Sequence, residues 1–487
     1  MQAVEAGEDR VGTGVAGLDD ILGGGLPRGE LHLVRGDAGT GKTTLGLQFL
    51  LEGAAAGERA LYLSFAQSQT GLRRIAAAHG WSLQGVEVLQ LPGADAGAGR
   101  QEQTLFHTAD VELREATAAV IEAVERVRPE RVVIDTMTTL RLLADGGLRY
   151  RRQLLGLRGF FDARPCTVLL LDGAGQDAAL DDTVYGILRL ERVVPEYGNV
   201  RRRLSAVKMR GVEFHGGHHT FRIRTGGIQV YPRLKPACMD TPGNWEVRTS
   251  GVRGIDALLG GGLEHGTACL VVGPTGTGKT SVATLYAYSA ARNGETAAVF
   301  CFDERRETFL MRARGLGMDL EPLLERGTLI LRSVSTAEFA PGEFAQIVRE
   351  AVERQRARVV MLDSLTGYFH AMPQEEALLA QMHDLLAYLG RQGVLSLLVV
   401  AQHGIAGDHM RGPLDVSYMA DAVVLLRHFE ADGQVRKAIS VLKKRNGSHE
   451  STIRELLLSG DGVAVGEPIA GFVGLLSGNP TLRPEAR

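Results

Sequence analysis

The chain has 487 residues, of which 44% are hydrophobic and 23% are charged, and its net charge is −3. This length suffices for two full hydrophobic cores, and the slightly negative charge argues against nucleic acid as the main partner. The four cysteines stand far apart, no apolar run approaches the length of a membrane span, and the acidic N-terminus is unlike a signal peptide. We therefore expect a cytoplasmic protein without a disulfide framework.

The first element in chain order is an apolar strand at 31–34 that leads into a glycine-rich loop. Residues 36–44 read GDAGTGKTT, which fits the phosphate-binding P-loop pattern, and a helix is predicted after them at 45–55. In such loops backbone N–H groups surround the phosphates, the lysine reaches the β/γ-phosphates and the next hydroxyl is placed to bind Mg²⁺. The predicted nucleotide-binding residues of this loop are Gly36, Gly39, Thr40, Gly41, Lys42, Thr43 and Thr44.

Strands and helices alternate after this loop. The predicted strands are 60–65, 131–135 and 167–171, and the predicted helices are 71–79 and 111–128. The strand at 131–135 ends on Asp135, and an aspartate in this place holds Mg²⁺ in P-loop enzymes. Thr43 and Asp135 are therefore the predicted metal residues, and two shorter β-rich runs complete this part of the chain near Leu234.

The same features return in the second half of the chain. Lys279 follows Lys42 by 237 residues, and the same offset joins 13–19 to 250–256. Residues 273–281 read GPTGTGKTS, between a predicted strand at 268–272 and a predicted helix at 281–292. The second set of predicted nucleotide-binding residues is Gly273, Thr275, Gly276, Thr277, Gly278, Lys279, Thr280 and Ser281.

The chain is therefore a duplication of one nucleotide-binding domain. We predict a first copy at 8–234, a linker at 235–244 and a second copy at 245–480. In the second copy the predicted strands are 297–302, 359–363, 394–401 and 422–426, with a helix at 343–355. The strand at 359–363 ends on Asp363, which joins Thr280 as a predicted metal residue. Alternation of this kind predicts an α/β fold, with a mostly parallel sheet covered by helices on both faces.

These motifs resemble a known family. The leader TGVAGLD with LGGGL, the P-loop and the strand that ends on aspartate are similar to those of RecA-like ATPases, and the tandem arrangement resembles the KaiC family of circadian-clock ATPases. The resemblance covers nearly the whole chain. It implies two tandem RecA-like P-loop NTPase domains, ATP and Mg²⁺ as cofactors, a homo-oligomer in the form of a hexameric ring, and a signalling protein as partner.

Each copy ends with a K-x-R strand that carries the most specific part of this resemblance. Lys208 and Arg210 in the first copy, and Lys443 and Arg445 in the second, match cations that point in this family at the ATP of the neighbouring subunit. Two residues that are two apart on a strand leave from the same face. A solvated strand edge would explain one such pair, but the recurrence in both copies favours a functional role.

The two copies differ in their carboxylates. Hydrolysis requires a group that orients water, and in this family it is a pair of glutamates after the second strand. The second copy has Asp303 and Glu304 there, of which we expect only one to face the nucleotide, whereas the first copy has Ala66 and Gln67. Loss of a positioned catalytic group costs about 10² to 10⁴ in rate. We therefore expect hydrolysis mainly in the second copy, unless Glu52 or Glu58 replaces the lost acids.

The family also phosphorylates itself on an adjacent serine and threonine before a late strand of its second domain. The matching segment here begins with Ser417 and Tyr418, so Ser417 is the candidate phosphoacceptor. The expected function is a KaiC-like ATPase with a possible serine/threonine autokinase activity. Two alternatives remain open, namely a DNA-dependent RecA-like motor or recombinase, and a nucleotide-gated scaffold with negligible turnover.

Overall fold

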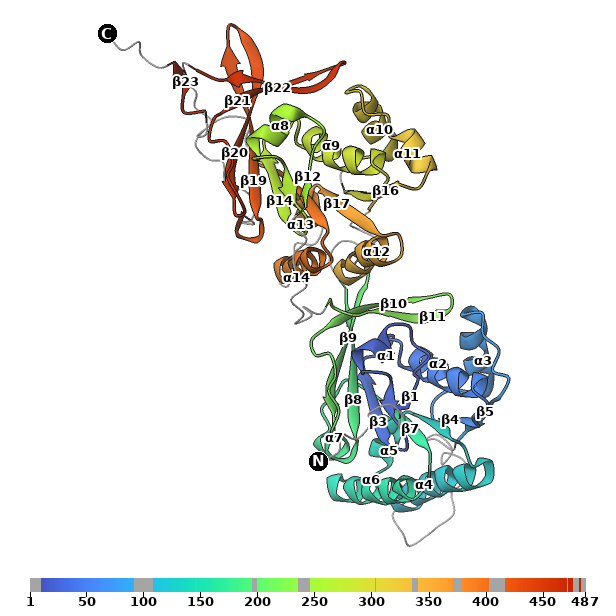
Figure 1. Ribbon diagram of the computed structural model, residues 1–487. Coiled ribbons are helices and arrows are strands. Elements are labelled where there is room, and N and C mark those ends of the chain that lie inside the picture. Colours follow the sequence, from blue (N-terminus) through green and yellow to red (C-terminus); the bar gives the residue numbers. More distant parts are fainter. Residues whose placement is uncertain are drawn as a thin grey trace, which may run out of the picture. The chain divides into compact units, whose positions relative to one another are not determined.

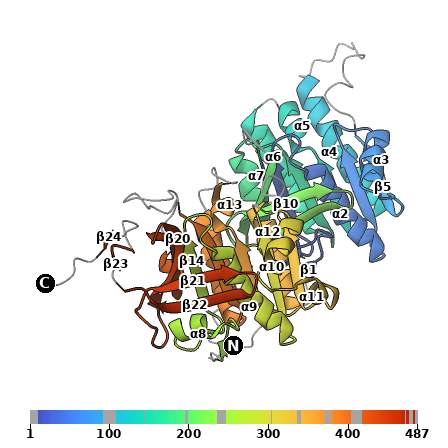
Figure 2. The same ribbon diagram turned by 90° about the horizontal axis from the view of Figure 1, so that it is seen from above.

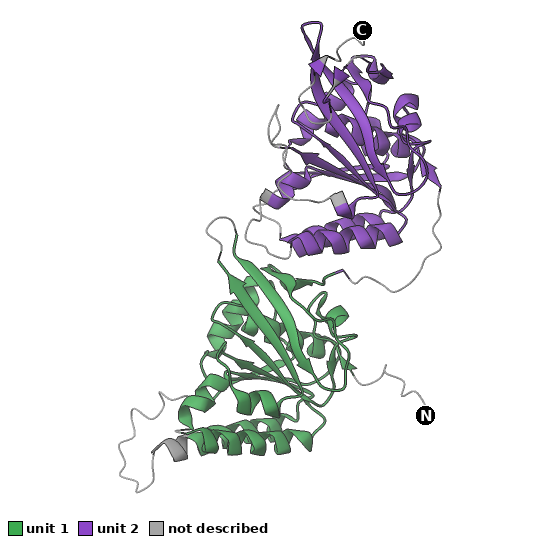
Figure 3. Ribbon diagram, turned by 90° about the vertical axis from the view of Figure 1, so that its left-hand side faces the viewer, with its two compact units in different colours: residues 1–233 green, residues 234–487 purple. Residues whose placement is uncertain are grey.

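The computed structural model describes residues 10–91, 108–144, 146–194, 199–234, 246–302, 304–334, 340–370, 378–402, 417–470, 472–475 and 481–482. These residues fall into two compact units, Met1–Arg233 and Leu234–Arg487, which we call unit 1 and unit 2 (Figures 1 and 3). Unit 1 holds the first copy of the repeat and unit 2 the second. The proposed linker at 235–244 lies outside the described residues.

Unit 1 is built on one sheet, which has nine strands in the described part of the chain, in the order β11-β10-β9-β8-β3-β7-β6-β4-β5. Its strands are β3 (Leu31–Gly36), β4 (Ala60–Ser64), β5 (Val86–Gln90), β6 (Arg131–Asp135), β7 (Thr167–Asp172), β8 (Gly186–Val193), β9 (Arg201–Met209), β10 (His219–Arg224) and β11 (Gly227–Tyr231). Strands β3 to β8 pair in parallel, and β9 to β11 extend the sheet as an antiparallel edge. A short ribbon of β1 (Arg10–Val11) and β2 (Leu26–Pro27) precedes the sheet.

The prediction of two short β-rich runs after β7 was wrong, because the structure has four strands there. Their many charged, half-buried residues, such as the run at 201–203 in β9, hide the alternation of apolar and polar positions. Pairing with β8 makes these residues a strand, and that pairing has no local signal in the sequence.

Helices cover both faces of this sheet (Figure 1). They are α1 (Leu18–Ile21), α2 (Lys42–Ala55), α3 (Gln69–Ala78), α4 (Thr108–Val127), α5 (Met137–Leu143), α6 (Gly147–Asp162) and α7 (Ala178–Thr183). Successive strand residues point to opposite faces, so Val34 packs in the core under α2 whereas Leu33 packs in the core under α4 and α6. Because both faces are covered, the central strands are buried along their whole length, as expected for a parallel sheet.

Unit 2 repeats this architecture. Its nine described strands follow the order β16-β15-β17-β18-β14-β19-β20-β21-β22, again with an antiparallel edge after the parallel part. They are β14 (Ala268–Gly273), β15 (Thr296–Cys301), β16 (Leu329–Ser333), β17 (Ala357–Asp363), β18 (Leu395–Ala401), β19 (Ala422–Ala431), β20 (Gln434–Lys444), β21 (Arg454–Ser459) and β22 (Gly462–Pro468). Two short ribbons add β12 (Val247–Arg248) with β13 (Leu263–Glu264) and β23 (Phe472–Val473) with β24 (Thr481–Leu482).

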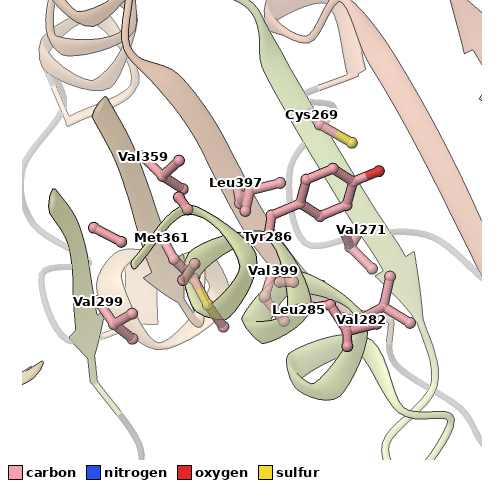
Figure 4. Packing of buried hydrophobic residues seen from close by; sticks show 14 of the residues in the cluster. Cys269, Val271, Val282, Leu285, Tyr286, Val299, Val359, Met361, Leu397 and Val399 are labelled. Carbon is pink, nitrogen blue, oxygen red and sulfur yellow. The ribbon is translucent and has the colours of Figure 1, made fainter. Parts of the chain in front are cut away.

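The helices of unit 2 are α8 (Arg253–Leu258), α9 (Lys279–Arg292), α10 (Arg306–Arg314), α11 (Glu321–Glu325), α12 (Pro341–Glu353), α13 (Leu365–His370) and α14 (Leu378–Arg391). Helix α8 lies against β22 (Figures 1 and 2). Helix α9 follows the P-loop, and its Val282, Leu285 and Tyr286 pack on the apolar side chains of β14, β17 and β18 (Figure 4). This packing fixes the start of α9 against the central strand, and therefore fixes the P-loop between them.

The chain is thus a tandem of two RecA-like α/β units. In each one the P-loop follows the central parallel strand and the aspartate closes another parallel strand, so both motifs lie at the carboxyl edge of the sheet, where α/β proteins bind ligands. Within the described residues, no helix is both long and apolar enough to cross a membrane.

Candidate nucleotide sites

Both P-loops have a backbone shape that only glycine allows. The residue before each P-loop helix, Gly41 in unit 1 and Gly278 in unit 2, has a φ of 107° and 98° respectively. A Cβ at Gly41 would come within 2.7 Å of the Ile223 side chain, and one at Gly278 within 2.7 Å of the Leu458 side chain. Glycine at these two positions therefore lets the loop keep the shape that presents its backbone N–H groups at the helix N-terminus, where they attract a phosphate.

Each P-loop lysine lies inside its own loop. The ammonium of Lys42 donates hydrogen bonds to the carbonyl oxygens of Gly36 (2.6 Å) and Asp37 (2.9 Å), and that of Lys279 donates to the carbonyl of Pro274 (2.7 Å). Burial lowers the pKa of Lys279 to about 8 and also lowers the pKa of Lys42. A buried ammonium with neutral partners gains most from an added anion, so both loops fit the phosphates of a nucleotide.

The other assigned loop residues support this shape. The hydroxyl of Thr40 donates to the carbonyl of Asp37, and the hydroxyl of Thr277 makes the equivalent bond to Pro274, both at 2.8 Å. Gly39 and Gly276 also have positive φ angles, of 76° and 84°. Thr44 and Ser281 are buried in the first turns of α2 and α9.

The four residues assigned to the metal come together in two pairs. In unit 1 the Thr43 hydroxyl lies 3.3 Å from a carboxylate oxygen of Asp135, and in unit 2 the Thr280 hydroxyl acts on the Asp363 carboxylate, whose pKa it lowers against the larger effect of burial. Both carboxylates are buried. A hydroxyl and a carboxylate beside a phosphate loop are oxygen ligands of the kind that Mg²⁺ prefers.

Unit 1 has further groups around Asp135 and the P-loop that the sequence analysis missed. The Tyr62 hydroxyl donates a 2.6 Å hydrogen bond to Asp135. Asp172, at the end of β7, is fully buried and pairs with Arg141, and it accepts a 2.7 Å bond from Thr138. No local motif marks these residues, because only the pairing of β4, β6 and β7 brings them to one edge of the sheet.

Unit 2 has a further carboxylate, that of Glu304, close enough to Asp363 to affect it. Burial raises the pKa of Asp363 to about 6, and the negative charge of Glu304 adds to this rise. Glu304 itself accepts a 2.7 Å hydrogen bond from Arg312 of α10, a residue that the sequence analysis did not single out. Strand β15 ends at Cys301, so the argument from strand alternation for one of Asp303 and Glu304 does not apply. Asp303 lies outside the described residues.

Unit 1 has no such acid after β4. Ala66 is exposed, and the backbone N–H of Gln67 donates to the Ser64 hydroxyl at 2.8 Å. The expected substitutes do not reach this place. Glu58 accepts hydrogen bonds from Arg131 (2.5 Å) and Arg28 (2.9 Å) near the amino end of β4. Glu52 lies about 15 Å along α2 from Lys42, at 1.5 Å per residue.

The K-x-R pairs lie away from the P-loops of their own units. Lys208 is level with Leu33 of β3, about 10 Å before Gly36 at the strand rise of about 3.3 Å per residue. Its ammonium donates to the carbonyl oxygens of Asp181 (2.5 Å) and Val184 (2.9 Å). Arg210 follows the last residue of β9 and donates to the carbonyl of Asp182.

Unit 2 repeats this arrangement. Lys443 donates to the carbonyl of Ala420 (2.7 Å), and Arg445 donates to the carbonyl of Tyr418 (3.0 Å) and pairs with Asp421 (3.3 Å). Both cations of each pair thus point to the segment that precedes β8 or β19, on one side of the sheet. Ser417 begins a short 3-10 turn in this segment, and its side chain lies outside the described part of the chain.

Comparison with known proteins follows the same division of the chain. The family model described as "ATPase: KaiC" matches residues 11–235 and 248–469. The circadian clock oscillator protein KaiC of Prochlorococcus marinus (strain MIT 9313) is 27% identical over 96% of this chain and 95% of its own length. KaiC of Synechococcus elongatus is 27% identical over 96% of this chain and 91% of its own, and KaiC of Acaryochloris marina is 28% identical over the same shares. With both P-loop units matched, the chain belongs to the KaiC ATPase family.

Proposed function

We propose that this protein hydrolyses ATP mainly in unit 2. The observation that carries the proposal is the position of Glu304, whose charge acts on the buried Asp363 and which Arg312 holds by a hydrogen bond. The corresponding residue of unit 1 is Gln67, a neutral amide that cannot accept a proton from water. Both units have a phosphate loop with a hydroxyl and an aspartate beside it, and of the two residues Gln67 and Glu304 only that of unit 2 is an acid.

In this proposal each residue of unit 2 has one task. Lys279 binds the β/γ-phosphates, and Thr280 with Asp363 would hold Mg²⁺, which supplies charge neutralisation at the phosphates. Glu304 or Asp303 orients the attacking water, and the hydrogen bond from Arg312 holds the Glu304 carboxylate in place. An ATPase assay with and without single-stranded DNA tests the function as a whole, since strong stimulation by DNA would favour a motor.

We further propose that the chain forms a hexameric ring in which Lys443 and Arg445 serve the ATP of the neighbouring subunit. Their distance from the P-loop of their own unit supports this role. So do their hydrogen bonds to the carbonyl oxygens of Ala420 and Tyr418, which direct both side chains to the segment before β19 and away from that P-loop. In unit 1, burial and the repulsion by Arg210 lower the pKa of Lys208, as expected for two neighbouring cations that a bound anion would stabilise.

Unit 1 is proposed to hold ATP as a structural ligand. Lys42→Ala should therefore give smaller oligomers by light scattering, because a ligand that binds only the assembled state stabilises it by about 2.7 kcal/mol at a hundredfold excess over Kd. Lys279→Ala, the same change in unit 2, is the matched control and should leave the rings intact. Rings of Lys42→Ala that equal those of wild type without added nucleotide would show that unit 1 is a decayed copy.

Autophosphorylation of Ser417 is the finer part of the proposed function. It is supported by the position of Ser417 at the start of the turn whose next carbonyl binds Arg445. After incubation with ATP, mass spectrometry should find one phosphate on the fragment that spans 417–421, and Ser417→Ala should remove it. Phosphate on neither Ser417 nor Tyr418 would leave an ATPase without kinase activity.

A further inference from the structure

One helix of unit 1 has an outer surface that its counterpart in unit 2 lacks. Helix α6 buries one side against the sheet through Tyr150, Leu154, Leu157 and Phe161. Helix α14 buries Leu378, Met382, Leu385 and Leu389, which have the same spacing. The strands that follow these helices, β7 and β18, both pair in parallel with the P-loop strand. The two helices are therefore equivalent, and α14 shows what the fold itself requires of this position.

The outer face of α6 combines leucine and arginine. Leu148 is 87% exposed and Leu155 is 55% exposed. Arg151 and Arg152 lie between them and are exposed as well. These four residues follow the spacing i, i+3, i+4 and i+7, so they share one face of the helix. We call them the α6 face. Leu142, on the preceding helix α5, adds a third leucine, 74% exposed.

The two arginines of the α6 face differ in their charge partners from the next arginine along the helix. Among the described residues, no carboxylate forms an ion pair with Arg151 or Arg152, whereas Arg158 on the next turn pairs with Asp162. The chain as a whole has a net charge of −3, so this positive surface is a local feature. In α14 the equivalent positions hold Leu379 and Ala380 instead of the two arginines, and His383 instead of Leu155.

Two glycines add a second, independent observation. Gly156 and Gly159 lie inside α6, are exposed, and have no atom within 4 Å of the position that a Cβ would take. Neither has a positive φ. Glycine inside a helix costs about 1 kcal/mol relative to alanine. Because the described part of unit 1 places nothing against these glycines, the space that they leave open allows the close approach of another backbone.

We propose that the α6 face is a docking surface for an acidic, amphipathic helix of another protein. The leucines offer apolar contacts at the i and i+7 positions of a helix pair, the arginines match carboxylates, and the glycines allow close backbone contact. A symmetric contact with a second copy would bring arginines against arginines, so a second copy could use this face only in a head-to-tail contact, which the oligomer measurement below distinguishes. Nucleic acid is a poorer fit, because this face has no aromatic side chain on which bases could stack.

The test uses the full-length protein and a fluorescent synthetic helical peptide with leucine at i, i+3 and i+7 and glutamate between them. A peptide with lysine for glutamate is the charge control. We expect binding by fluorescence anisotropy for the glutamate peptide alone, weaker at high salt. Leu148→Ser with Leu155→Ser, and separately Arg151→Gln with Arg152→Gln, should each raise Kd by about tenfold or more, as for residues at the centre of an interface.

Matched controls exist in the same chain. Arg73→Gln with Arg74→Gln removes two adjacent exposed arginines from α3 of the same unit, and Met311→Ser with Val435→Ser removes two apolar side chains that are 72% and 73% exposed in unit 2. Neither pair should change Kd by more than about twofold. Equal losses of affinity in these controls would overturn the assignment to the α6 face.

Substitution of the glycines separates loss of binding from loss of stability, because the two are expected to change in opposite directions. Gly156→Gln with Gly159→Gln should raise the thermal midpoint by roughly 2 to 4 °C, because glutamine favours the helix, and yet should weaken peptide binding about tenfold. No peptide binding, or unchanged affinity in this variant, would overturn the proposal. Binding of phosphatidylserine vesicles or single-stranded DNA through the same residues would overturn it in favour of those ligands. If the variants of the α6 face form smaller oligomers than the wild type, and the wild type binds no peptide, the face belongs to a contact with a second copy and the proposal is overturned.

Discussion

Lys279→Ala should lower steady-state ATP turnover by about 10² or more, the range for loss of a positioned catalytic group. The lysine ammonium is buried in the P-loop, where it donates a hydrogen bond to the Pro274 carbonyl, a neutral partner that leaves its charge for the β/γ-phosphates. Turnover is measured by phosphate release at saturating ATP. Lys279→Met, which keeps the buried aliphatic chain, should lose as much activity and thereby separate the charge from the packing.

Replacing the acids of unit 2 by amides, and comparing the effect with a change at the corresponding position of unit 1, also tests whether hydrolysis belongs to unit 2. Glu304→Gln should lower turnover strongly if Glu304 is the base, and Asp303→Asn should do so if Asp303 is. Gln67→Ala, at the corresponding position of unit 1, should leave turnover within about twofold, because no catalytic group is removed there. If Lys279→Ala keeps more than half of the wild-type activity, the chemistry does not belong to unit 2.

Mixing two inactive variants should restore activity if catalysis crosses the subunit boundary. Arg445→Ala removes a cation whose backbone is level with Ala268, about 17 Å before Gly273 along the strands at about 3.3 Å per residue. A cation donated by a neighbour is worth about 10³ to 10⁵ in phosphoryl transfer in other P-loop enzymes, so Arg445→Ala alone should be nearly inactive. Lys279→Ala alone should be inactive for a different reason.

In rings assembled from equal amounts of Arg445→Ala and Lys279→Ala, about one interface in four joins an intact P-loop to an intact arginine, if assembly is random. We therefore expect recovery of up to about a quarter of the wild-type rate. The control mixes Lys279→Ala with Lys279→Met, both of which lack the same group, and should recover nothing. Absence of recovery in rings shown by mass spectrometry to be mixed would rule out the role across the interface.

A motif whose residues are close in sequence can be predicted without the fold, because its chemistry depends on local backbone geometry. Both P-loops are of this kind, since the spacing of glycine, lysine and hydroxyl already defines a phosphate loop. The aspartates that close β6 and β17 were also predicted, because a buried parallel strand is a continuous apolar run that ends visibly on a charge. The family of the chain followed from these residues and was confirmed by the match to both units.

Only the tertiary structure decided which charged residues meet across the fold. Glu52 and Glu58 were credible substitutes for the lost acids of unit 1, and the structure places Glu58 in an ion pair with Arg131 instead. The bonds from Arg312 to Glu304 and from Tyr62 to Asp135 join residues on different elements. Sequence distance does not determine such contacts, because the order and register of strands decide which side chains share an edge.

The sequence by itself therefore predicted two phosphate loops, a hydroxyl and an aspartate beside each of them, and the adjacent acids Asp303 and Glu304 in the second copy alone. Only the tertiary structure decided where long side chains point, because their direction depends on the neighbouring strands and segments. Lys208 and Lys443 point away from their own P-loops because β8 and β19 set the register of the strands that carry them. The exposure of Leu148 likewise depends on packing, because α6 lies on the sheet through the face that carries Leu154 and Leu157 and leaves Leu148 outside.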